Sequence, residues 1–462
     1  MNPTPPDDRP IPLETVEDAA AYLEGLINRE RATDYVYRRL DLRPIEALME
    51  ALGRPESALS IIHVAGSKGK GSTCLFAESL LLSLGERVGT FTSPHLVSWV
   101  ERFRVDGRAI DGATLVAAVD RIRPIVDALR EGPEETRPSF FDATTAVALL
   151  VFAEAGVDRV LLEVGLGGRL DSTNIVSPDV TCITSIELEH TDKLGETEAL
   201  IAGEKAGILK PGAPGVVGPL RDEAMSVVLT RAAQVGTALR TFEGDYRVSS
   251  GDTSDEVLVV ESPDGFRVAC GLAAPGDAAR TNAALAIACV RALGAHPDAD
   301  IARACRTGLA GCTLPGRVER LAADPLVIVD SSHTARSIAA LVDSLGTLAP
   351  GGFDLALSVS ADKALDDVIA PLILAAGRGR IVTTRAEPAR GVPADMLAKR
   401  IDELAERLGL GFGVLDVRAI EDPEQALRVA RASLEPDRVL CTTGSVYLAG
   451  VARQVLGGTP PR

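Results

Sequence analysis

The chain has 462 residues, of which 48 are Lys or Arg and 65 are Asp or Glu, so its formal net charge is −17. Such an acidic chain repels a phosphate backbone, which excludes general nucleic-acid binding but leaves room for a local basic pocket. No run of 18 apolar residues occurs, so the sequence predicts no membrane span. At about 150 residues per domain, this length allows two or three domains.

The N-terminal residues and the cysteines indicate the cellular compartment of the protein. The first residues, MNPTPPDDRPIP, lack the basic and apolar regions of a signal peptide, and we expect residues 1–12 to form a disordered lead. Seven cysteines are scattered without a C-x-x-C pair, which argues against a disulfide framework or a zinc site. A cytoplasmic location follows as the expectation.

Strand-like and helix-like segments alternate along most of the chain. The apolar run Ala58–Val64 predicts a strand, a glycine-rich turn follows it, and Ser72–Leu84 predicts a helix. Further buried strands are expected at Val160–Val164 and Val180–Thr184, and a helix at Glu198–Leu209 that Pro211 ends. Alternating segments flank a Pro-Asp-Gly turn within 238–272, which indicates an antiparallel β insert. Helices are then expected at Ala278–Leu293 and Ala299–Leu309.

A regular β-α rhythm follows Leu314-Pro315-Gly316. The predicted strands are 326–330, 354–359, 380–384, 412–416 and 438–442, and the predicted helices are 334–347, 365–376, 393–408, 423–433 and 445–455. Such alternation predicts a parallel sheet with helices on both faces. The fold class is therefore α/β, with a P-loop-containing N-terminal domain over 13–308, a hinge over 309–316 and a smaller Rossmann-like α/β domain over 317–462.

The first chemical signal lies between the first predicted strand and its helix. It reads Gly66-Ser67-Lys68-Gly69-Lys70-Gly71-Ser72-Thr73. Glycines let backbone N–H groups turn toward a phosphate, and the helix N-terminus favours its charge. Lys70 would then reach the β- and γ-phosphates, and Ser72 could bind Mg²⁺. The strict G-x-x-x-x-G-K-[ST] pattern is not met, so a tight strand-to-helix turn is the alternative.

From this point the chain resembles a known family, folylpolyglutamate synthase/dihydrofolate synthase, within the Mur-type amide ligases. HVAGSKGKGS at 63–72 is similar to that family's HVAGTNGKGS. Further matches follow in chain order: Phe91-Thr-Ser93-Pro94-His95-Leu96, Glu101-Arg102-Phe103, Glu163-Val-Gly165 through Asn174, Ile183-Thr-Ser185, His190-Thr191, Leu194-Gly195, Glu204 through Ile208, Pro315 through Glu319, Asp330 with His333, and Thr443 through Tyr447. So many matches in the right order make the resemblance specific.

The resemblance implies an ATP- and Mg²⁺-dependent ligase that joins L-glutamate to a folate-type acid through an acyl phosphate. It implies an N-terminal domain like the Mur-ligase central domain. The implied catalytic residues are Lys70, Lys205, His190 and Arg317. The implied ligands of two metal ions are Ser72, Ser93, Glu163, His190 and, if carbamylated, Lys205. Residues 66–73, Asn282, Arg317, Asp330 and His333 are expected to bind ATP. We expect a monomer without nucleic-acid or membrane partners.

Each assignment has a structural alternative. Glu163 could instead form a salt bridge to Arg169, and His190 could be a buried core histidine. Lys205 could be a solvated helix lysine, whereas carbamylation requires a neutral amine in a buried site. Caps or solvated loops are the alternatives for Asn282, Asp330 and His333.

Departures from the family pattern leave the acid substrate open. They are Ser67-Lys68 for Thr-Asn, Asp142 for Glu, Glu187-Leu188-Glu189 for Gly-Leu-Asp, Ser331-Ser332-His333-Thr334 for Gly-Ala-His-Asn, and Ala278-Ala279 for His-Gln. Lys68 adds a cation beside the phosphates. The functional alternatives are a divergent Mur-type ligase acting on a non-folate acid and a nucleotide-binding protein without ligase activity. Dihydrofolate synthase activity is also left open.

Overall fold

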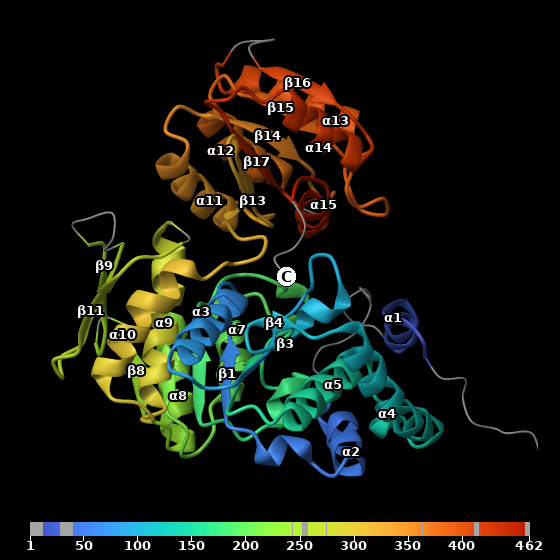
Figure 1. The fold of residues 1–462 in the computed structure, drawn as a ribbon, viewed down its shortest axis with the longest axis vertical. Helices are drawn as coiled ribbons and strands as arrows, with labels where there is room; N and C mark the ends of the chain where they lie inside the picture. Colours follow the sequence, from blue (N-terminus) through green and yellow to red (C-terminus); the bar gives the residue numbers. More distant parts are fainter. Residues whose placement is uncertain are drawn as a thin grey trace, which may run out of the picture.

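Two α/β domains make up the computed structural model, one stacked on the other (Figure 1). It describes residues 13–27, 40–242, 244–251, 257–273, 275–361, 364–410 and 415–457. The predicted lead, 1–12, lies outside them. The predicted α/β fold class is confirmed, and the boundaries placed at 308–316 stay a prediction.

An eight-stranded sheet forms the N-terminal domain, in the order β4-β3-β2-β5-β1-β6-β7-β8. Its strands are β1 (Ile61–Ala65), β2 (Val88–Phe91), β3 (Phe103–Val105), β4 (Arg108–Ala109), β5 (Arg159–Glu163), β6 (Val180–Ile183), β7 (Gly215–Val217) and β8 (Leu239–Thr241). Six strands are parallel, and β3 and β4 add an antiparallel edge. β1 lies between β5 and β6, and all five of its residues are buried. Burial on both faces explains its continuous apolar sequence.

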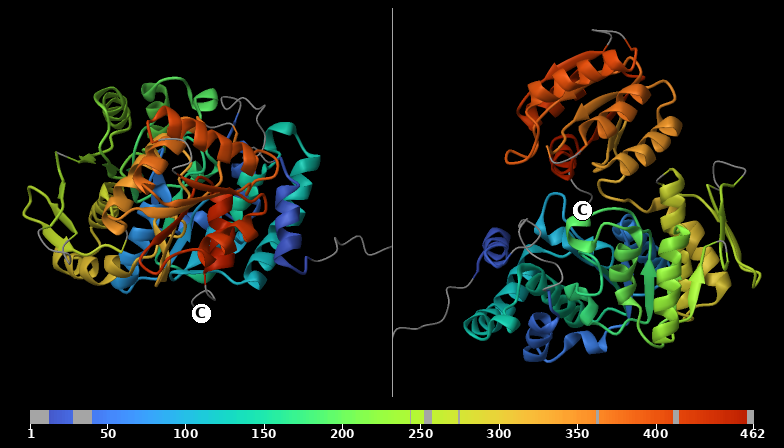
Figure 2. Two further views of the ribbon diagram at one scale, coloured as in Figure 1. Left: turned by 90° about the horizontal axis from the view of Figure 1, so that it is seen from above. Right: turned by 180° about the vertical axis from the view of Figure 1, so that it is seen from behind.

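Helices cover both faces of this sheet (Figures 1 and 2). They are α1 (Val16–Glu24), α2 (Arg43–Ala51), α3 (Lys70–Ser83), α4 (Gly112–Glu131), α5 (Phe140–Ala155), α6 (Thr191–Leu194), α7 (Glu198–Lys205), α8 (Asp222–Val235), α9 (Asp277–Ala292) and α10 (Asp298–Gly308). Ile62 and Val64 pack with α3, α9 and α10 in one core cluster. Ile61 packs with α1, α2, α4 and α5, and Ala65 packs with α7 and α8. The alternation along β1 therefore divides the core between the two faces.

The helix predicted at Glu198–Leu209 is shorter than expected. The α-helix α7 ends at Lys205, and a 3₁₀ turn covers Ala206–Ile208.

A separate segment, Glu134–Ala155, is long and apolar enough to span a membrane, but 78% of its apolar window is buried in the domain. It contains α5, a core helix.

The predicted antiparallel insert is confirmed. It contains β9 (Arg247–Ser249), β10 (Leu258–Glu261) and β11 (Arg267–Cys270), in the order β11-β10-β9. The Pro-Asp-Gly turn joins β10 to β11, and its Gly265 has φ of +95°, a conformation that favours glycine. The start of the predicted segment instead forms β8 and extends the main sheet.

A six-stranded sheet forms the C-terminal domain, in the order β12-β13-β17-β14-β15-β16. Its strands are β12 (Glu319–Ala323), β13 (Leu326–Val329), β14 (Phe353–Leu357), β15 (Arg380–Thr383), β16 (Asp416–Ala419) and β17 (Val439–Thr443). Its helices are α11 (Ala335–Leu348), α12 (Leu365–Ala376), α13 (Ala394–Arg407), α14 (Pro423–Ala432) and α15 (Val446–Leu456). All strands are parallel except β12, which pairs with β13 in antiparallel fashion and was not predicted.

The strand predicted at 412–416 lies mostly outside the described residues, and the strand described there begins at Asp416. The strand is β16, which pairs only with β15 at the edge of the sheet. Its residues are mostly exposed, so they lack the apolar run that the prediction relied on. Residues 411–414 lie outside the described part of the chain.

Candidate active site

The glycine-rich loop joins β1 to α3 and lies below the C-terminal domain. Gly69 precedes the first turn of α3, has φ of +84°, and leaves that turn without a side-chain cap. A Cβ at Gly69 would lie 2.2 Å from Asn282 Oδ1, and one at Gly66 would lie 1.8 Å from Thr184 Oγ1. Both positions therefore require glycine. Uncapped N–H groups at a helix N-terminus make a suitable site for a phosphate.

Three chain segments converge at Gly71. A Cβ there would lie 3.2 Å from Glu163 Oε2 and 3.4 Å from Arg317 Nη2. Glu163 ends β5, whereas Arg317 comes from the segment leading into the second domain. The structure thus brings a carboxylate and a guanidinium to the start of α3, as the sequence predicts for an interdomain site.

The surroundings of Glu163 suit a charged group. Its side chain is buried, and Oε2 accepts a hydrogen bond from Ser93 N at 2.9 Å. Burial raises the pKa of Glu163, while the charges of Lys70 and Arg317 act in the opposite direction. The alternative of a salt bridge to Arg169 is wrong, because Arg169 pairs with Glu204 at 2.9 Å.

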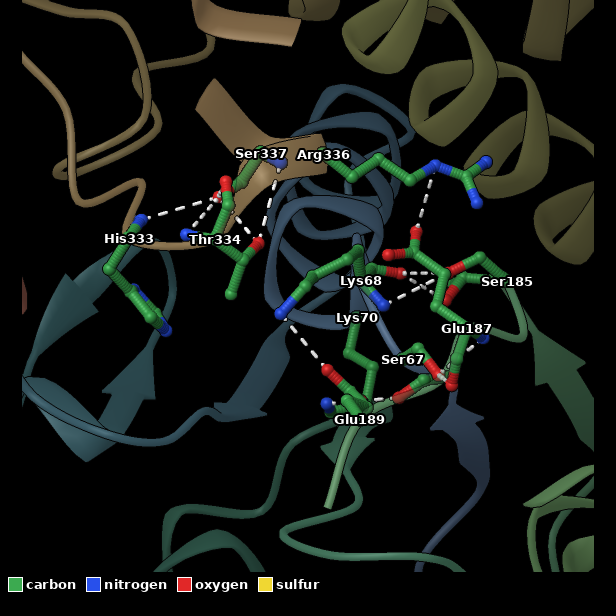
Figure 3. A network of polar contacts seen from close by, with 12 residues as sticks. Ser67, Lys68, Lys70, Ser185, Glu187, Glu189, His333, Thr334, Arg336 and Ser337 are labelled. Carbon is green, nitrogen blue, oxygen red and sulfur yellow. Dashed lines mark hydrogen bonds and ion pairs between the residues drawn. The ribbon is translucent and has the colours of Figure 1, made fainter. Parts of the chain in front are cut away.

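Three lysines surround one carboxylate, that of Glu189. Lys68 Nζ lies 2.9 Å from Glu189 Oε2, and Lys205 Nζ lies 3.7 Å from Glu189 Oε1. Lys70 Nζ donates to Gly66 O at 3.1 Å. Burial raises the pKa of Glu189, but the charges of Lys68, Lys205 and Lys70 outweigh it and lower that pKa. Lys68 is therefore not a free cation beside the phosphates (Figure 3).

Lys205 lies inside the protein. Its side chain is 2% exposed, so the alternative of a solvated helix lysine is wrong. Burial lowers its pKa to about 7, with the charge of Lys70 acting in the same direction. A large part of this amine is therefore neutral near pH 7, which is what carbamylation requires.

Residues Ser185–Glu189, which we call the strap, lie along the glycine-rich loop (Figure 3). Ser67 N donates to Ser185 O at 2.8 Å, and Glu187 N donates to Ser67 Oγ at 2.9 Å. Lys68 N donates to Ser185 Oγ at 2.9 Å. Glu187 and Glu189 depart from the family pattern, but no periodicity in the sequence pairs them with Lys68 or with the loop.

His190 follows the strap and precedes the short helix α6. Its φ is +49°, and the residue is exposed, so the alternative of a buried core histidine is wrong. An exposed imidazole remains accessible to a ligand at this end of the strap.

The second domain contributes Asp330 and His333 after β13. Asp330 is buried, and its two oxygens accept hydrogen bonds from Val318 N at 2.9 Å and Ser332 N at 2.8 Å. His333 Nδ1 lies 2.9 Å from Ser331 O, which fixes one edge of the ring. Asp330 thus caps the turn that presents Arg317 and His333, which is the cap alternative given for this residue.

The residues present fit a divalent ion held partly by a nucleotide. Among the described residues, no three His, Cys, Asp or Glu side chains gather in one cluster. Mg²⁺ needs no such cluster, since it commonly binds one or two carboxylates together with phosphates and water. Glu163 supplies a buried carboxylate directly beside Gly71, the residue before Ser72. Thr73 Oγ1, one residue further, is buried without a hydrogen-bond partner in the described part of the chain.

One further departure, Asp142, has a structural explanation. Asp142 is buried in the first turn of α5 and accepts hydrogen bonds from Ser139 Oγ and Ser172 Oγ, each at 2.6 Å. The shorter Asp side chain thereby ties α5 to the segment at 171–174. That segment lies beside Glu163, since Asp171 Oδ2 accepts a hydrogen bond from Leu166 N at 2.9 Å.

Asp171 leads to a prediction about stability. Burial raises its pKa to about 6 from an ordinary value of 3.8, so the folded state binds this proton more tightly than the unfolded state does. Its contribution to the free energy of unfolding therefore falls as pH rises through pH 4–6, by about 3 kcal/mol. We expect Asp171→Asn to remove this fall. The free energy of unfolding of the variant, measured by denaturant melts, should therefore increase relative to that of the parent from pH 4 to pH 7.

The control is Asp111→Asn. The hydrogen bond from Thr114 N lowers the pKa of Asp111, so this variant should lose stability relative to the parent as pH rises. A parallel pH dependence for Asp171→Asn and the parent would contradict the prediction.

The comparisons with known proteins agree with this geometry. The Mur ligase middle domain matches residues 64–290, and the Mur ligase, glutamate ligase domain matches 316–446. Dihydrofolate synthase/folylpolyglutamate synthase of Mycobacterium tuberculosis is 33% identical over 91% of this chain and 90% of the relative.

Solved structures show the same similarity. A bifunctional folylpolyglutamate synthase/dihydrofolate synthase from Yersinia pestis, complexed with AMPPNP and Mn, aligns with a TM-score of 0.80 at 29% identity, covering 97% of this chain and 100% of that one. An Escherichia coli relative in complex with DHPP and ADP aligns with a TM-score of 0.79 at 29% identity, covering 97% and 99%.

The fold and the interdomain site define an ATP-dependent ligase of the Mur type. Within that class, the chain belongs to the folylpolyglutamate synthase/dihydrofolate synthase family.

Proposed function

We propose that the chain is an ADP-forming ligase that adds L-glutamate to a folate-type carboxylate. The observation that carries this proposal is the convergence of Gly71, Glu163 and Arg317 at the interdomain face. A nucleoside triphosphate bound to the glycine-rich loop would contact Lys70 of the N-terminal domain and Arg317 from the segment that leads into the C-terminal domain. The related proteins solved with AMPPNP and with DHPP and ADP support both the nucleotide and the pterin-type acid.

The proposed chemistry has two steps. The oxygen of the acid's carboxylate attacks the γ-phosphorus, the bond to the ADP oxygen breaks, and an acyl phosphate forms. The amine of glutamate then attacks the acyl carbon, the bond to phosphate breaks, and an amide forms with loss of a proton. Such phosphoryl transfer depends on positioning and charge neutralisation rather than on a covalent bond to the protein.

Different residues would bind the phosphates, neutralise charge and contact the rest of the nucleotide. The backbone of 66–73 would bind the β- and γ-phosphates, and Lys70 and Arg317 would neutralise charge on the transferring group. Asn282 lies against Gly69, where it could contact the adenine side, and His333 could contact the ribose. Asp330 would act on the nucleotide only through the turn that it holds. His190, at the end of the strap, would assist at the acyl-phosphate side.

Two Mg²⁺ ions are part of the proposal. Ser72 and Glu163 would hold one with the phosphates, and Ser93, His190 and a carbamylated Lys205 would serve the other. A bound divalent ion would neutralise phosphate charge during transfer. The low pKa and burial of Lys205 support its carbamylation.

Glu163→Gln tests the metal assignment. The amide retains the shape but loses the charge that binds a divalent ion, so we expect the Mg²⁺ concentration for half-maximal activity to rise by about 10- to 100-fold. The measurement is a Mg²⁺ titration of ADP release. Glu204→Gln, which removes the α7 partner of Arg169, is the control and should leave the titration unchanged. An unaltered Mg²⁺ requirement in Glu163→Gln would remove Glu163 from the metal site.

A substrate panel tests the function itself. Purified protein, ATP, Mg²⁺ and L-glutamate are incubated with folates, with dihydropteroate or with non-folate acids, and ADP and product mass are measured. Glutamate addition to folates supports the proposal, and addition to dihydropteroate adds dihydrofolate synthase activity. ADP formed only with another acid would show a divergent Mur-type ligase, and none with any acid would favour a nucleotide-binding protein.

We also propose a cytoplasmic monomer without nucleic-acid or membrane partners. The acidic net charge supports the absence of a nucleic-acid partner. The seven described cysteines are all free and buried, which agrees with a reducing compartment.

A further inference from the structure

An ion pair joins the two domains above the glycine-rich loop. Arg336 lies in the first turn of α11, and its Nε is 3.3 Å from Glu187 Oε1 in the strap (Figure 3). The Glu187 side chain is 13% exposed, whereas that of Arg336 is 67% exposed. A carboxylate buried to this degree gains from a fixed cation more than a solvated one does.

Glu187 is tied directly to the loop that would bind phosphate. Its backbone N–H donates to Ser67 Oγ at 2.9 Å, and Ser67 N in turn donates to Ser185 O. Glu187 is therefore linked to Ser67 by a direct hydrogen bond, so a displacement of Glu187 would also displace Ser67. No other residue lies between Arg336 and the loop in this chain of contacts.

The same face of α11 contacts the N-terminal domain again two turns later. Ser344 Oγ donates to Pro275 O at 3.2 Å, in the segment that leads into α9 and Asn282. Arg336 and Ser344 are eight residues apart, so they lie on one side of the helix. On the opposite flank of the interface, α15 approaches Leu96, and Arg453 Nη1 lies 3.6 Å from Glu101 Oε1. Of these three contacts between described residues, that of Arg336 is the one linked to the glycine-rich loop, through Glu187.

We propose that Arg336 and Glu187 form an interdomain clasp that positions the C-terminal domain, with Arg317, over the glycine-rich loop. Arg336 is then a positioning residue that acts through Glu187 and touches no substrate. The family pattern has Gly at position 187, so the clasp belongs to this chain and not to the motif. The inference rests on the proposed nucleotide site but not on the identity of the acid.

The test measures nucleotide binding and domain distance separately from ligation. Glu187→Gln and Arg336→Gln should each weaken binding of a non-hydrolysable ATP analogue by about three- to five-fold, the range of a partly exposed ion pair. Added salt should weaken binding to the parent and affect the variants less. Because both residues act as one unit, the double variant should bind no more weakly than the worse single variant.

Domain distance supplies a readout that a purely local structural role would not change. Dyes placed at Leu229→Cys on α8 and Met396→Cys on α13 report the distance by energy transfer, because both positions are exposed and the seven native cysteines are buried. We expect the analogue to produce a narrower distance distribution in the parent than in either variant.

The control variant is Glu424→Gln, which breaks an exposed ion pair to Arg428 within α14. It should match the parent in both measurements. Additive losses in the double variant, or distance distributions identical to that of the parent, would overturn the clasp. Failure of the chain to ligate any acid would leave both measurements interpretable, so it would contradict the proposed function alone.

Discussion

Lys70→Ala should lower the kcat of ligation by about 10²–10³-fold, the usual cost of removing one donor aimed at developing charge. Lys70 begins α3, and its Nζ donates to Gly66 O at 3.1 Å, so the amine is held at the mouth of the loop. Within the described part of the chain, that hydrogen bond is the one that the variant loses in the absence of nucleotide. The melting temperature should therefore change little, and the measurement is ADP release at saturating ATP, Mg²⁺ and acid.

Lys68→Asn is the matched control for this variant. Lys68 carries the same charge two residues earlier, but Glu189 already pairs with it at 2.9 Å. We expect less than about a tenfold change in its kcat, because an ion pair of this kind contributes little net charge to the site. If Lys68→Asn were as damaging as Lys70→Ala, the assignment of the phosphate-contacting lysine would be wrong.

Arg317→Gln should lower kcat by about 10³-fold, the lower end of the effect known for an arginine that stabilises a transferring phosphoryl group. Its Nη2 comes within 3.4 Å of the Cβ position of Gly71, so the guanidinium lies beside the first turn of α3. The planar fork can bind two phosphate oxygens at once, which an amide or an ammonium cannot do. Single-turnover formation of the acyl phosphate is the measurement.

Arg317→Lys separates charge from geometry. It retains the cation and should recover part of the rate, but it cannot form the bidentate contact. Arg320→Gln is the control, since Arg320 lies three residues later in β12 with an exposed side chain. A fall in nucleotide affinity with no change in the phosphoryl-transfer rate would place Arg317 in binding rather than in catalysis.

The sequence predicted the fold well where burial is uniform. β1, β5, β6, β14 and β17 lie inside their sheets, so nearly all of their residues are buried and most are apolar, and short apolar segments of this kind indicate buried strands. β12 and β16 lie at the edges of the C-terminal sheet, where β12 has one buried residue and β16 has none, so neither carries a buried run. The antiparallel β12 was missed for that reason, and the described strand β16 begins at Asp416, the last residue of the strand predicted at 412–416.

The candidate site likewise has parts that the sequence predicts and parts that it does not. Glycines with positive φ and a strand end leave local marks in the sequence, so the loop and Glu163 could be predicted. The pairing of Lys68 with Glu189 spans 121 positions, and no local pattern encodes it. The role of Asp330 in holding Val318 likewise depends on how the second domain folds back on its own linker.

That linker turn has a consequence for turnover. Asp330 holds Val318, Ser331 N donates to Gly316 O, and Glu319 Oε2 accepts from Gly316 N, so Arg317 moves as a rigid part of the C-terminal domain. Separation of the domains would withdraw the guanidinium and His333 together. An enzyme waiting for its acid would then keep the glycine-rich loop and Glu163 but lack the arginine beside the transferring phosphoryl group, so hydrolysis of ATP without ligation would be slow.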